Sequence, residues 1–263
     1  MSASKIAVEG VSKQFDQAGN PVQALAKLNL AISEGEFVSI VGPSGCGKST
    51  LLYMLGGFIA ADSGRMLVDG RPITGPGVDR GVVFQEYALF PWLTVFDNIA
   101  YGLRESRMTE RDVRVTAERY IRLIGLTGFE NRFSRELSGG MKQRVALART
   151  FAYEPSILLL DEPFGALDAQ TREIMQDELL RLWRTTGKTV IMVTHDVSEA
   201  VYLSNRVCVM SQRPGRIVKE YTINLDRSTN REEVVLSEAY TAIRNDVWLA
   251  VRQQVILASP GDR

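Results

Sequence analysis

Short apolar runs and helix-like apolar spacings alternate along most of this chain. The runs predict strands at residues 6–8, 28–32, 37–41, 65–68, 81–85, 157–160, 190–193, 206–210 and 216–221. Apolar residues at intervals of three and four predict helices after residue 47, between 95 and 131, at 138–153, 171–184 and 197–203, and from about 231. Strands that alternate with helices of this length predict an α/β fold with a mostly parallel sheet covered on both faces.

The block between residues 95 and 131 is helical, whereas the segments before and after it are rich in strands. Val113, Ala117, Tyr120, Ile121 and Ile124 recur as one face of a helix requires. We therefore expect a helical insertion at this point of the chain.

The composition limits the binding partners and the cellular compartment that we expect for the protein. The chain has 31 basic and 31 acidic residues, so the one-sided positive charge of a nucleic-acid binder is missing and we expect no nucleic-acid partner. Cys46 and Cys208 are too few for a disulfide framework, which favours a reducing compartment. The first residues lack the apolar stretch of a signal peptide, and no apolar run approaches the roughly 18 residues of a membrane span. We expect a cytosolic protein, so other chains must supply any membrane part.

A phosphate-binding pattern lies between the strand predicted at 37–41 and the helix that follows it. The segment consists of Gly42, Pro43, Ser44, Gly45, Cys46, Gly47, Lys48, Ser49 and Thr50. It satisfies the Walker A pattern in the required strand–loop–helix context, which disfavours a chance glycine-rich turn. The glycines let backbone N–H groups face inward as an anion nest, and the helix N-terminus adds partial positive charge. We expect Lys48 to reach the β- and γ-phosphates of ATP and Ser49 to help bind Mg²⁺.

An acidic pair follows a second buried strand. Residues 157–160 are four apolar residues, and Asp161 and Glu162 come directly after them. We expect Asp161 to hold Mg²⁺ through water and Glu162 to act as the general base that polarises the attacking water. Two buried carboxylates without a cation would be costly, which favours this functional interpretation.

With these two elements in place, nearly the whole chain resembles the ATP-binding subunits of ABC transporters. The most specific resemblance is residues 137–144, whose Ser138, Gly139 and Gly140 match the ABC signature. Ser138 is a good helix N-cap, and the glycines expose backbone N–H groups to an anion. The resemblance implies that this motif closes on the γ-phosphate bound by a second subunit. Met141 stands where the family usually has Gln, which puts only a peripheral polar contact in doubt.

Other positions of the family fall in the same order along this chain. Gln85 matches the Q-loop glutamine that senses Mg²⁺ and the γ-phosphate, and Asp168 lies in a segment like the D-loop. His195, the only histidine, follows a predicted strand and matches the switch histidine that contacts the γ-phosphate. Phe15 matches the aromatic residue that stacks on adenine, and a core role for it remains the alternative.

The resemblance implies a P-loop NTPase core with a mostly parallel sheet, an antiparallel β part and a helical subdomain. We assign residues 1–94 and 155–225 to the core and β part, and residues 95–154 to the helical subdomain with the signature. Residues 226–263 form a short C-terminal helical extension.

Three functions compete at this stage: the ATPase of a membrane importer, a soluble ABC ATPase of repair or translation, and another P-loop enzyme such as a kinase. The signature disfavours the kinase, and the absence of heptad arms and of a second Walker A motif disfavours the soluble ATPase. The importer is favoured by the apolar segment around Phe90 and Trp92, which in the family helps form the groove for a short helix of the membrane subunit. Packing of these aromatic residues inside the helical subdomain is the alternative.

The importer interpretation implies several partners. It implies a homodimer of this chain, two transmembrane permease subunits, and a periplasmic or extracellular solute-binding protein that acts through the permease. The chain would then lie on the cytoplasmic face of the inner membrane. Residues 75–85, 90–92 and 213–217 look most like the nitrate/sulfonate/taurine branch of importers, with the taurine ATPases the most similar. We rank taurine or another sulfonate first and nitrate second, with a thiamine precursor as another possibility.

Overall fold

The computed structural model describes residues 4–17, 19–227 and 229–258. Two compact units account for the chain: residues 1–77 with 180–263, and residues 78–179. We call them unit 1 and unit 2. The predicted division into a core, a helical subdomain of residues 95–154 and an extension of residues 226–263 stays a prediction.

Unit 1 contains an antiparallel sheet with the strand order β2-β1-β4-β5. Its strands are β1 (Ile6–Gln17), β2 (Asn20–Ile32), β4 (Ser63–Val68) and β5 (Arg71–Pro72). The β1–β2 hairpin is much longer than the strands predicted at 6–8 and 28–32. The ends of both strands next to the turn are mostly exposed, and buried Val11 and residues 24–26 lie beyond the predicted apolar runs.

Unit 1 also holds four strands of a second sheet, in the order β10-β9-β3-β8. Strands β3 (Phe37–Val41), β8 (Thr189–Val193) and β9 (Arg206–Met210) are parallel, and β10 (Ile217–Thr222) pairs antiparallel with β9. Every residue of β3 and β8 is buried, and all of them except Ser39 and Thr189 are apolar, as expected for strands covered on both faces. The mainly parallel sheet confirms the predicted α/β class.

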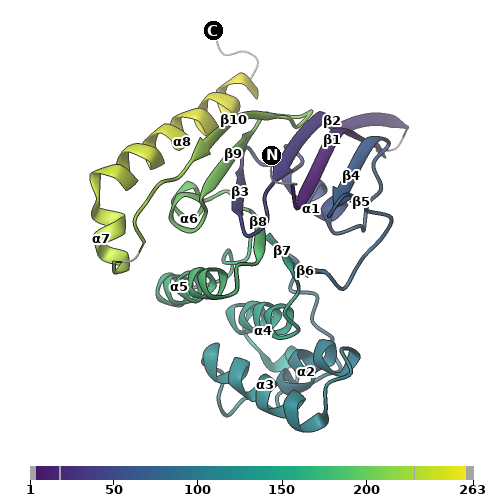
Figure 1. Cartoon of the computed structure of the whole chain (residues 1–263), viewed down its shortest axis with the longest axis vertical. Helices are drawn as coiled ribbons and strands as arrows, with labels where there is room; N and C mark the ends of the chain where they lie inside the picture. The colour runs from purple at the N-terminus through teal and green to yellow at the C-terminus, as the bar shows by residue number, and fades with distance from the viewer. Residues whose placement is uncertain (1–3, 18, 228, 259–263) are drawn as a thin grey trace. The chain divides into compact units, whose positions relative to one another are not determined.

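Several helices lie wholly within the described residues of unit 1. They are α1 (Lys48–Leu55), α6 (Val197–Leu203), α7 (Arg231–Leu236) and α8 (Glu238–Ala258). Helix α6 packs on β3 and α8 on β9, while α1 contacts β8. Figure 1 shows α6 and α8 to one side of this sheet and α1 to the other. Both faces of the sheet are therefore covered, as predicted.

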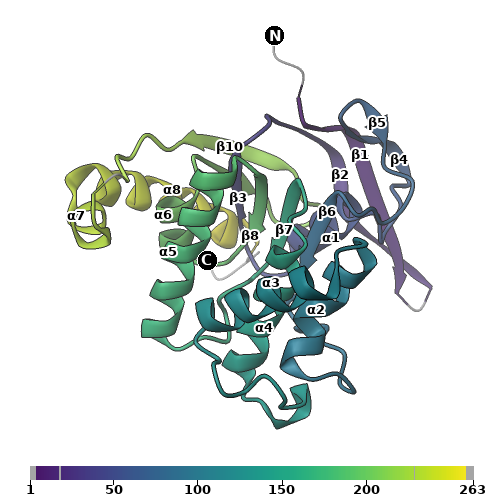
Figure 2. The same ribbon diagram turned by 60° about the horizontal axis from the view of Figure 1, so that its bottom comes forward.

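Unit 2 combines a pair of parallel strands with a group of helices. Its elements are β6 (Arg80–Val83), β7 (Ile157–Asp161), α2 (Val95–Glu105), α3 (Glu110–Leu123), the 3-10 helix η1 (Ser134–Glu136) and α4 (Gly139–Ala152). Helices α2, α3 and α4 pack on one another and lie side by side in Figures 1 and 2. Helix α5 (Ala169–Thr186) begins in unit 2 and ends in unit 1.

The predicted helical block of residues 95–131 is divided into two helices with separate caps. The hydroxyl oxygen of Thr94 accepts a hydrogen bond from the backbone N–H of Asp97 at 3.0 Å and so begins α2. Thr109 caps α3 through the N–H of Asp112 at 3.2 Å. Across the described ranges, no helix has both the length and the apolar character that crossing a bilayer requires.

Candidate active site

The glycine-rich loop of unit 1 joins the end of β3 to the first turn of α1, in the predicted strand–loop–helix arrangement. Gly47 stands directly before the helix with φ of 105°, in the left-handed region that favours glycine. A β-carbon there would also lie 2.8 Å from Cδ2 of Leu25. Only glycine therefore lets the loop enter the helix this close to β2.

Lys48 is held inside this loop. Its Nζ donates hydrogen bonds to the carbonyl oxygens of Gly42 at 2.9 Å and Pro43 at 3.0 Å, and only 7% of the residue is exposed. Carbonyl dipoles offset part of the cost of burying the ammonium group. Phosphate oxygens offer the same kind of partner with a full negative charge, so this position suits a cation that binds an anion entering the loop.

Cys46 is buried in the same loop, with its Sγ 4.0 Å from Nζ of Lys48. Burial raises the pKa of the Cys46 thiol, and the charge of Lys48 offsets this only in part. The thiol is therefore neutral at pH 7, and its slow reaction with alkylating reagents is expected. Ser49 and Thr50, half-buried in the first turn of α1, present hydroxyl groups next to Lys48 in the sequence.

The acidic pair of unit 2 lies at the carboxyl end of β7. Asp161 is the last residue of the strand and is fully buried, and Glu162 follows with a left-handed φ of 45°. Nε2 of Gln85 lies 3.4 Å from Oε2 of Glu162. The parallel register of β6 and β7, which pairs Val83 with Leu160, explains this proximity because it brings the ends of both strands to one edge. Gln85 lies two residues beyond β6, so the strand predicted to end at residue 85 is shorter than expected.

The segment after Gln85 is held by a residue that sequence analysis missed. Tyr87 and Ala88 both have left-handed backbone, with φ of 45° and 46°. The guanidinium group of Arg149 donates to the carbonyl oxygens of Ala88 at 2.7 Å and Tyr87 at 3.3 Å. Burial lowers the pKa of Arg149, although the group stays cationic at pH 7. No local pattern marks Arg149, because its partners lie about sixty residues earlier.

The signature segment begins α4 as predicted. The Ser138 hydroxyl accepts a hydrogen bond from the N–H of Met141 at 3.3 Å, which confirms its N-cap position. Gly139 and Gly140 are the first residues of the helix, and a β-carbon on Gly139 would lie 3.0 Å from the Tyr87 hydroxyl. The lack of a side chain at Gly139 therefore lets the Tyr87 hydroxyl lie close to the start of α4.

Asp168 occupies an exposed position at the start of α5. Its Oδ1 accepts a hydrogen bond from the N–H of Thr171 at 3.0 Å, and this bond lowers the pKa of the Asp168 carboxyl group. The residue is therefore an anionic helix cap at neutral pH.

His195 lies two residues beyond the end of β8 and is exposed. The residues around it form a fixed turn: Thr194 donates to the Glu199 carboxylate at 2.9 Å, and Asp196 caps α6 through the N–H of Ser198 at 2.7 Å. The imidazole therefore stands on a rigid segment at the carboxyl end of a parallel strand, where α/β proteins place ligand-binding residues.

Phe15 lies on β1, paired with Val22 of β2, and 36% of it is exposed. The Lys13 ammonium group lies 5.5 Å from the centroid of its ring and also pairs with Asp62 at 2.7 Å. Phe15 is therefore not a core residue, and its ring is accessible to a planar ligand.

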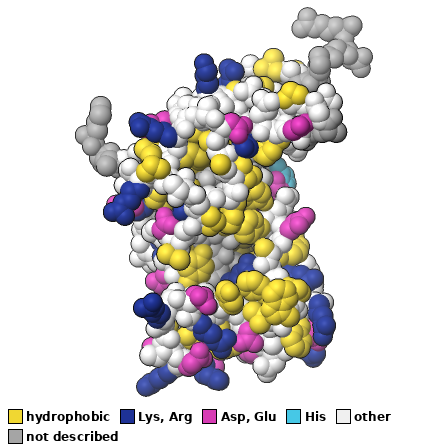
Figure 3. Space-filling model, turned by 90° about the vertical axis from the view of Figure 1, so that its right-hand side faces the viewer, with side chains coloured by type: hydrophobic (Ala, Val, Ile, Leu, Met, Phe, Trp, Pro, Cys, Tyr) yellow, Lys and Arg dark blue, Asp and Glu magenta, His cyan; other side chains and the backbone are white. Residues whose placement is uncertain are grey.

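The aromatic segment, defined here as residues 90–93, forms an apolar surface on unit 2. The Phe90 ring packs against Trp92 and Tyr101, with centroid distances of 5.7 and 4.7 Å. Trp92 is 69% exposed and Tyr101 47%, which excludes Trp92 from the core of the helical region. Figure 3 shows hydrophobic side chains gathered on the lower part of the molecule, the part that holds α2 and α3 in Figure 1.

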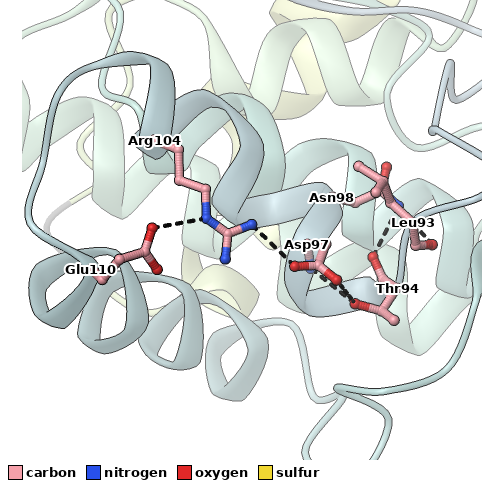
Figure 4. Close-up of polar contacts among 6 residues, drawn as sticks. All are labelled: Leu93, Thr94, Asp97, Asn98, Arg104 and Glu110. Carbon is pink, nitrogen blue, oxygen red and sulfur yellow. Dashed lines mark hydrogen bonds and ion pairs between the residues drawn. The ribbon is translucent and has the colours of Figure 1, made fainter.

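A polar network on α2 holds this segment in place (Figure 4). The buried side chain of Asn98 accepts from the N–H of Phe90 at 2.9 Å and donates to the carbonyl oxygens of Phe90, Leu93 and Thr94 at 2.9–3.2 Å. Arg104, in the last turn of α2, donates to Asp97 in the first turn at 3.1 Å and to Glu110 of α3 at 3.2 Å. The hydrogen bonds of the Asn98 amide thus fix the backbone that carries the exposed aromatic rings.

The predicted site residues are divided between the two units. Unit 1 contains Phe15, residues 42–50 and His195. Unit 2 contains Gln85, Asp161, Glu162, Ser138, Gly139, Gly140 and Asp168. Within unit 2 the structure brings Gln85 and Glu162 together, and within unit 1 it assembles the loop around Lys48.

Comparison with known proteins gives a consistent set of matches. A family model described as "ABC transporter" matches residues 25–165. A nitrate import ATP-binding protein of Synechocystis sp. is 49% identical over 83% of this chain and 82% of its own length. A taurine import ATP-binding protein of Ruegeria pomeroyi is 44% identical over 93% of this chain and 92% of its own length.

Among solved structures, the fold matches the ATP-binding cassette MJ0796, described as a dimer in a post-hydrolysis state bound to ADP and Pi. The TM-score is 0.77 at 34% sequence identity, over 83% of this chain and 99% of the other. The match extends over nearly all of that cassette.

Proposed function

We propose that this chain, which belongs to the ABC transporter family, hydrolyses ATP to drive the import of a small anionic or zwitterionic solute. The resemblance predicted from the motifs, the P-loop fold and the ATPase class are confirmed by the family match and the relatives. The observation that carries the mechanism is the 3.4 Å approach of Gln85 to Glu162. Separate sequence motifs predicted these two residues, and they lie close together at the carboxyl ends of β6 and β7.

In this proposal the loop of residues 42–50 binds the triphosphate of ATP. Its backbone N–H groups and the N-terminus of α1 form the anion nest, and Lys48 exchanges its carbonyl partners for β- and γ-phosphate oxygens. The adenine ring stacks on Phe15, whose exposed ring supports this assignment. His195 contacts the γ-phosphate from its rigid turn.

Mg²⁺ is expected with the nucleotide, and the donor chemistry of the chain fits it. Ser49, Gln85 and Asp161 offer hydroxyl, amide and carboxylate oxygens, the hard ligands that this ion prefers. The full burial of the Asp161 carboxylate at the end of β7 is consistent with a cation partner. When bound, the ion would neutralise negative charge on the phosphates.

Hydrolysis needs a group that accepts a proton from water as the water attacks the γ-phosphorus. We assign this role to the Glu162 carboxylate, which the Gln85 amide orients by donating to Oε2. The signature residues Ser138, Gly139 and Gly140, with Asp168, would complete the site of a second copy. Support for a homodimer comes from the exposed helix start of α4 and from the dimeric assembly of the related cassette.

A competent ATPase of this type needs membrane partners to move a solute. We propose that two permease subunits dock on the aromatic segment, whose exposed Trp92 suits a helix-in-groove contact. A solute-binding protein would act through the permease, and the chain would lie at the cytoplasmic face of the membrane. The order of cargoes follows the branch resemblance of residues 75–85, 90–92 and 213–217: taurine or another sulfonate first, nitrate second, and a thiamine precursor as a further candidate. Relatives named for nitrate and taurine import support the first two candidates.

The hydrolytic assignment is tested by Glu162→Gln in the full-length protein. We expect ATP turnover to fall about 10²- to 10⁴-fold, as for loss of a general base, while ATP binding is kept. Glu105→Gln is the matched control because it removes the same charge from an exposed position at the end of α2. Turnover by Glu162→Gln at the rate of this control would contradict the assignment.

The importer role and its cargo are tested by growth of a deletion strain on taurine, alkanesulfonates or nitrate as sole sulphur or nitrogen source. Loss of growth restricted to sulfonate sulphur, restored by the parent gene and not by Lys48→Ala, is the expected result. Normal growth on every source, with redundant importers also deleted, would exclude these cargoes. Sensitivity to DNA damage or defective translation in the same strain would instead favour the soluble ATPase.

A further inference from the structure

The turn around residues 213–217, which in the sequence only indicated the branch of importers, contacts the P-loop. Residues 211–216 connect β9 to β10, and we call them the β9–β10 turn. Within unit 1 the guanidinium group of Arg213 donates two hydrogen bonds to one acceptor, the carbonyl oxygen of Gly45. The bonds from Nε and Nη2 measure 3.0 and 2.9 Å.

The β9–β10 turn is itself rigid. The Ser211 hydroxyl donates to the carbonyl oxygens of Gln212 at 2.9 Å and Pro214 at 3.1 Å, and it accepts from the N–H of Arg216 at 3.0 Å. Backbone bonds close the turn, since the N–H of Ser211 donates to the carbonyl of Arg216 at 2.8 Å. Arg213 is therefore presented from a fixed base.

The same turn is attached to β2, beside the loop. The N–H of Gly215 donates to the carbonyl of Ala24 at 2.8 Å, and the carbonyl of Gly215 accepts from the N–H of Ala26 at 3.2 Å. A β-carbon on Gly215 would collide with the carbonyl oxygen of Cys46. The turn thus contacts two successive peptide groups of the P-loop, those that begin at Gly45 and Cys46.

The geometry of a trans peptide makes the Gly45 contact informative. The carbonyl of Gly45 and the N–H of Cys46 belong to one planar peptide group and point in opposite directions. While Arg213 holds the carbonyl outward, the N–H of Cys46 points into the loop, where it donates to the carbonyl of Pro43 at 3.3 Å. Gly45 has a left-handed φ of 74°, so without this contact its peptide group could rotate at little steric cost.

We infer that Arg213 is a positioning residue of the P-loop, which fixes the Gly45–Cys46 peptide and so keeps the loop in its anion-binding conformation. The inference rests on the proposed role of residues 42–50 in binding ATP and goes beyond it, because Arg213 acts through the Gly45 carbonyl and not on the phosphates. Its positive charge next to the loop also favours an anionic ligand. Preorganisation of this kind improves affinity by removing the cost of ordering the loop.

The test compares Arg213→Ala with Arg216→Ala in the full-length protein. Arg216 is the matched control because it is exposed, lies in the same turn and contributes to it through its backbone N–H. ADP, which is not hydrolysed, is titrated by calorimetry. We expect Arg213→Ala to bind ADP about tenfold more weakly, the order of one charge-assisted hydrogen bond, with Arg216→Ala close to the parent. The KM for ATP should rise while kcat changes much less.

Cys46 provides a readout that is independent of activity. Its rate of alkylation by N-ethylmaleimide, followed by peptide mass spectrometry, should increase in Arg213→Ala because the neighbouring peptide is released. Cys208, buried in β9, serves as the internal reference for global unfolding. Arg213→Lys keeps the charge but not the paired donors, so partial recovery of ADP binding is expected, and this variant replaces Arg213→Ala if that protein does not fold.

Equal ADP affinity, KM and Cys46 alkylation in the Arg213 and Arg216 variants would overturn the inference. Lys48→Ala distinguishes this failure from failure of the proposed function. If Lys48→Ala loses ADP binding while Arg213→Ala keeps it, only the role of Arg213 is wrong. If Lys48→Ala binds ADP like the parent, the assignment of the loop itself is wrong.

Discussion

The side chain of Asn98 holds the backbone of Phe90 from both sides, accepting from its N–H at 2.9 Å and donating to its carbonyl oxygen at 3.2 Å. Asn98 is fully buried and belongs to α2, whereas Phe90 belongs to the aromatic segment. One amide group therefore ties the segment to the helix and fixes how its rings are presented.

Removal of this amide should destabilise unit 2. Asn98→Ala removes the acceptor of the Phe90 N–H, whereas the Phe90 carbonyl keeps donors from the Ser134 hydroxyl and the N–H of Leu93. We expect the loss of the buried amide to lower the free energy of unfolding by about 1–3 kcal/mol. Urea unfolding followed by circular dichroism measures the change. Asn131→Ala, at an exposed position, is the control and should stay within about 0.5 kcal/mol of the parent. A loss as small as that in Asn98→Ala would show that water replaces the amide.

Trp92→Ala separates docking from folding. Because Trp92 is mostly exposed, its removal should leave the unfolding transition and the basal ATPase rate nearly unchanged. Stimulation of the ATPase by the reconstituted permease subunits should fall severalfold, as expected for loss of an aromatic anchor at an interface. Val115→Ala, an exposed apolar residue on α3, is the control. Full stimulation of Trp92→Ala would exclude the aromatic segment as the docking surface.

Phe15→Ala tests the proposed adenine contact. Stacking of a base on an aromatic ring contributes about 1–3 kcal/mol, so we expect nucleotide affinity to fall roughly 5- to 100-fold. Titration with ATP and with inorganic triphosphate distinguishes the base from the phosphates, because only ATP should bind more weakly. Phe58→Ala removes another exposed ring of unit 1, 49% exposed, and should change neither affinity. Equal weakening of both ligands would point to damage of the loop.

Cys208 predicts a loss of stability in alkaline solution. Burial, with a smaller contribution from the charge of Glu220, raises the pKa of its thiol from 9.0 to about 12. The folded protein keeps this proton when the unfolded chain has already lost it, so stability is complete below pH 9 and is lost as pH rises toward 12. The loss should approach about 1.4 kcal/mol per pH unit within that window.

Urea unfolding of the parent and of Cys208→Ala between pH 8 and 11 measures this contribution. We expect the slope of unfolding free energy against pH to be shallower in the variant, which has no thiol at that position. Parallel slopes for the two proteins would show that Cys208 ionises equally in the folded and unfolded states.

The sequence was informative where chemistry depends on neighbours in the chain. The loop around Lys48 and the acidic end of β7 are local patterns, and β3 is apolar apart from Ser39 because every position is buried. The hairpin of β1 and β2 was underestimated because exposed Lys27 separates buried residues 24–26 from the predicted run and residues near the turn are mostly exposed. Contacts such as Arg213 with Gly45, 168 residues apart, leave no periodic signal and could not be predicted.

Backbone conformation was also beyond prediction from residue types. Glu162, Tyr87 and Ala88 adopt left-handed φ angles although none of them is glycine. Such conformations persist only where tertiary contacts fix them, as the guanidinium group of Arg149 does for two of the three. Long-range contacts therefore decide the local geometry beside the Gln85–Glu162 pair.

The two carbonyl bonds of Lys48 give nucleotide binding the character of an exchange reaction. An incoming anion does not bind a solvated ammonium group. It must displace the two carbonyl oxygens that already accept hydrogen bonds from Lys48. The binding free energy that Lys48 contributes is therefore the difference between its interaction with the anion and its interaction with the two carbonyl oxygens. This difference grows with the charge density of the ligand. Monovalent anions such as chloride should therefore compete poorly for this loop at cellular concentrations. Polyphosphates, which carry several negative charges, should displace the carbonyl oxygens readily.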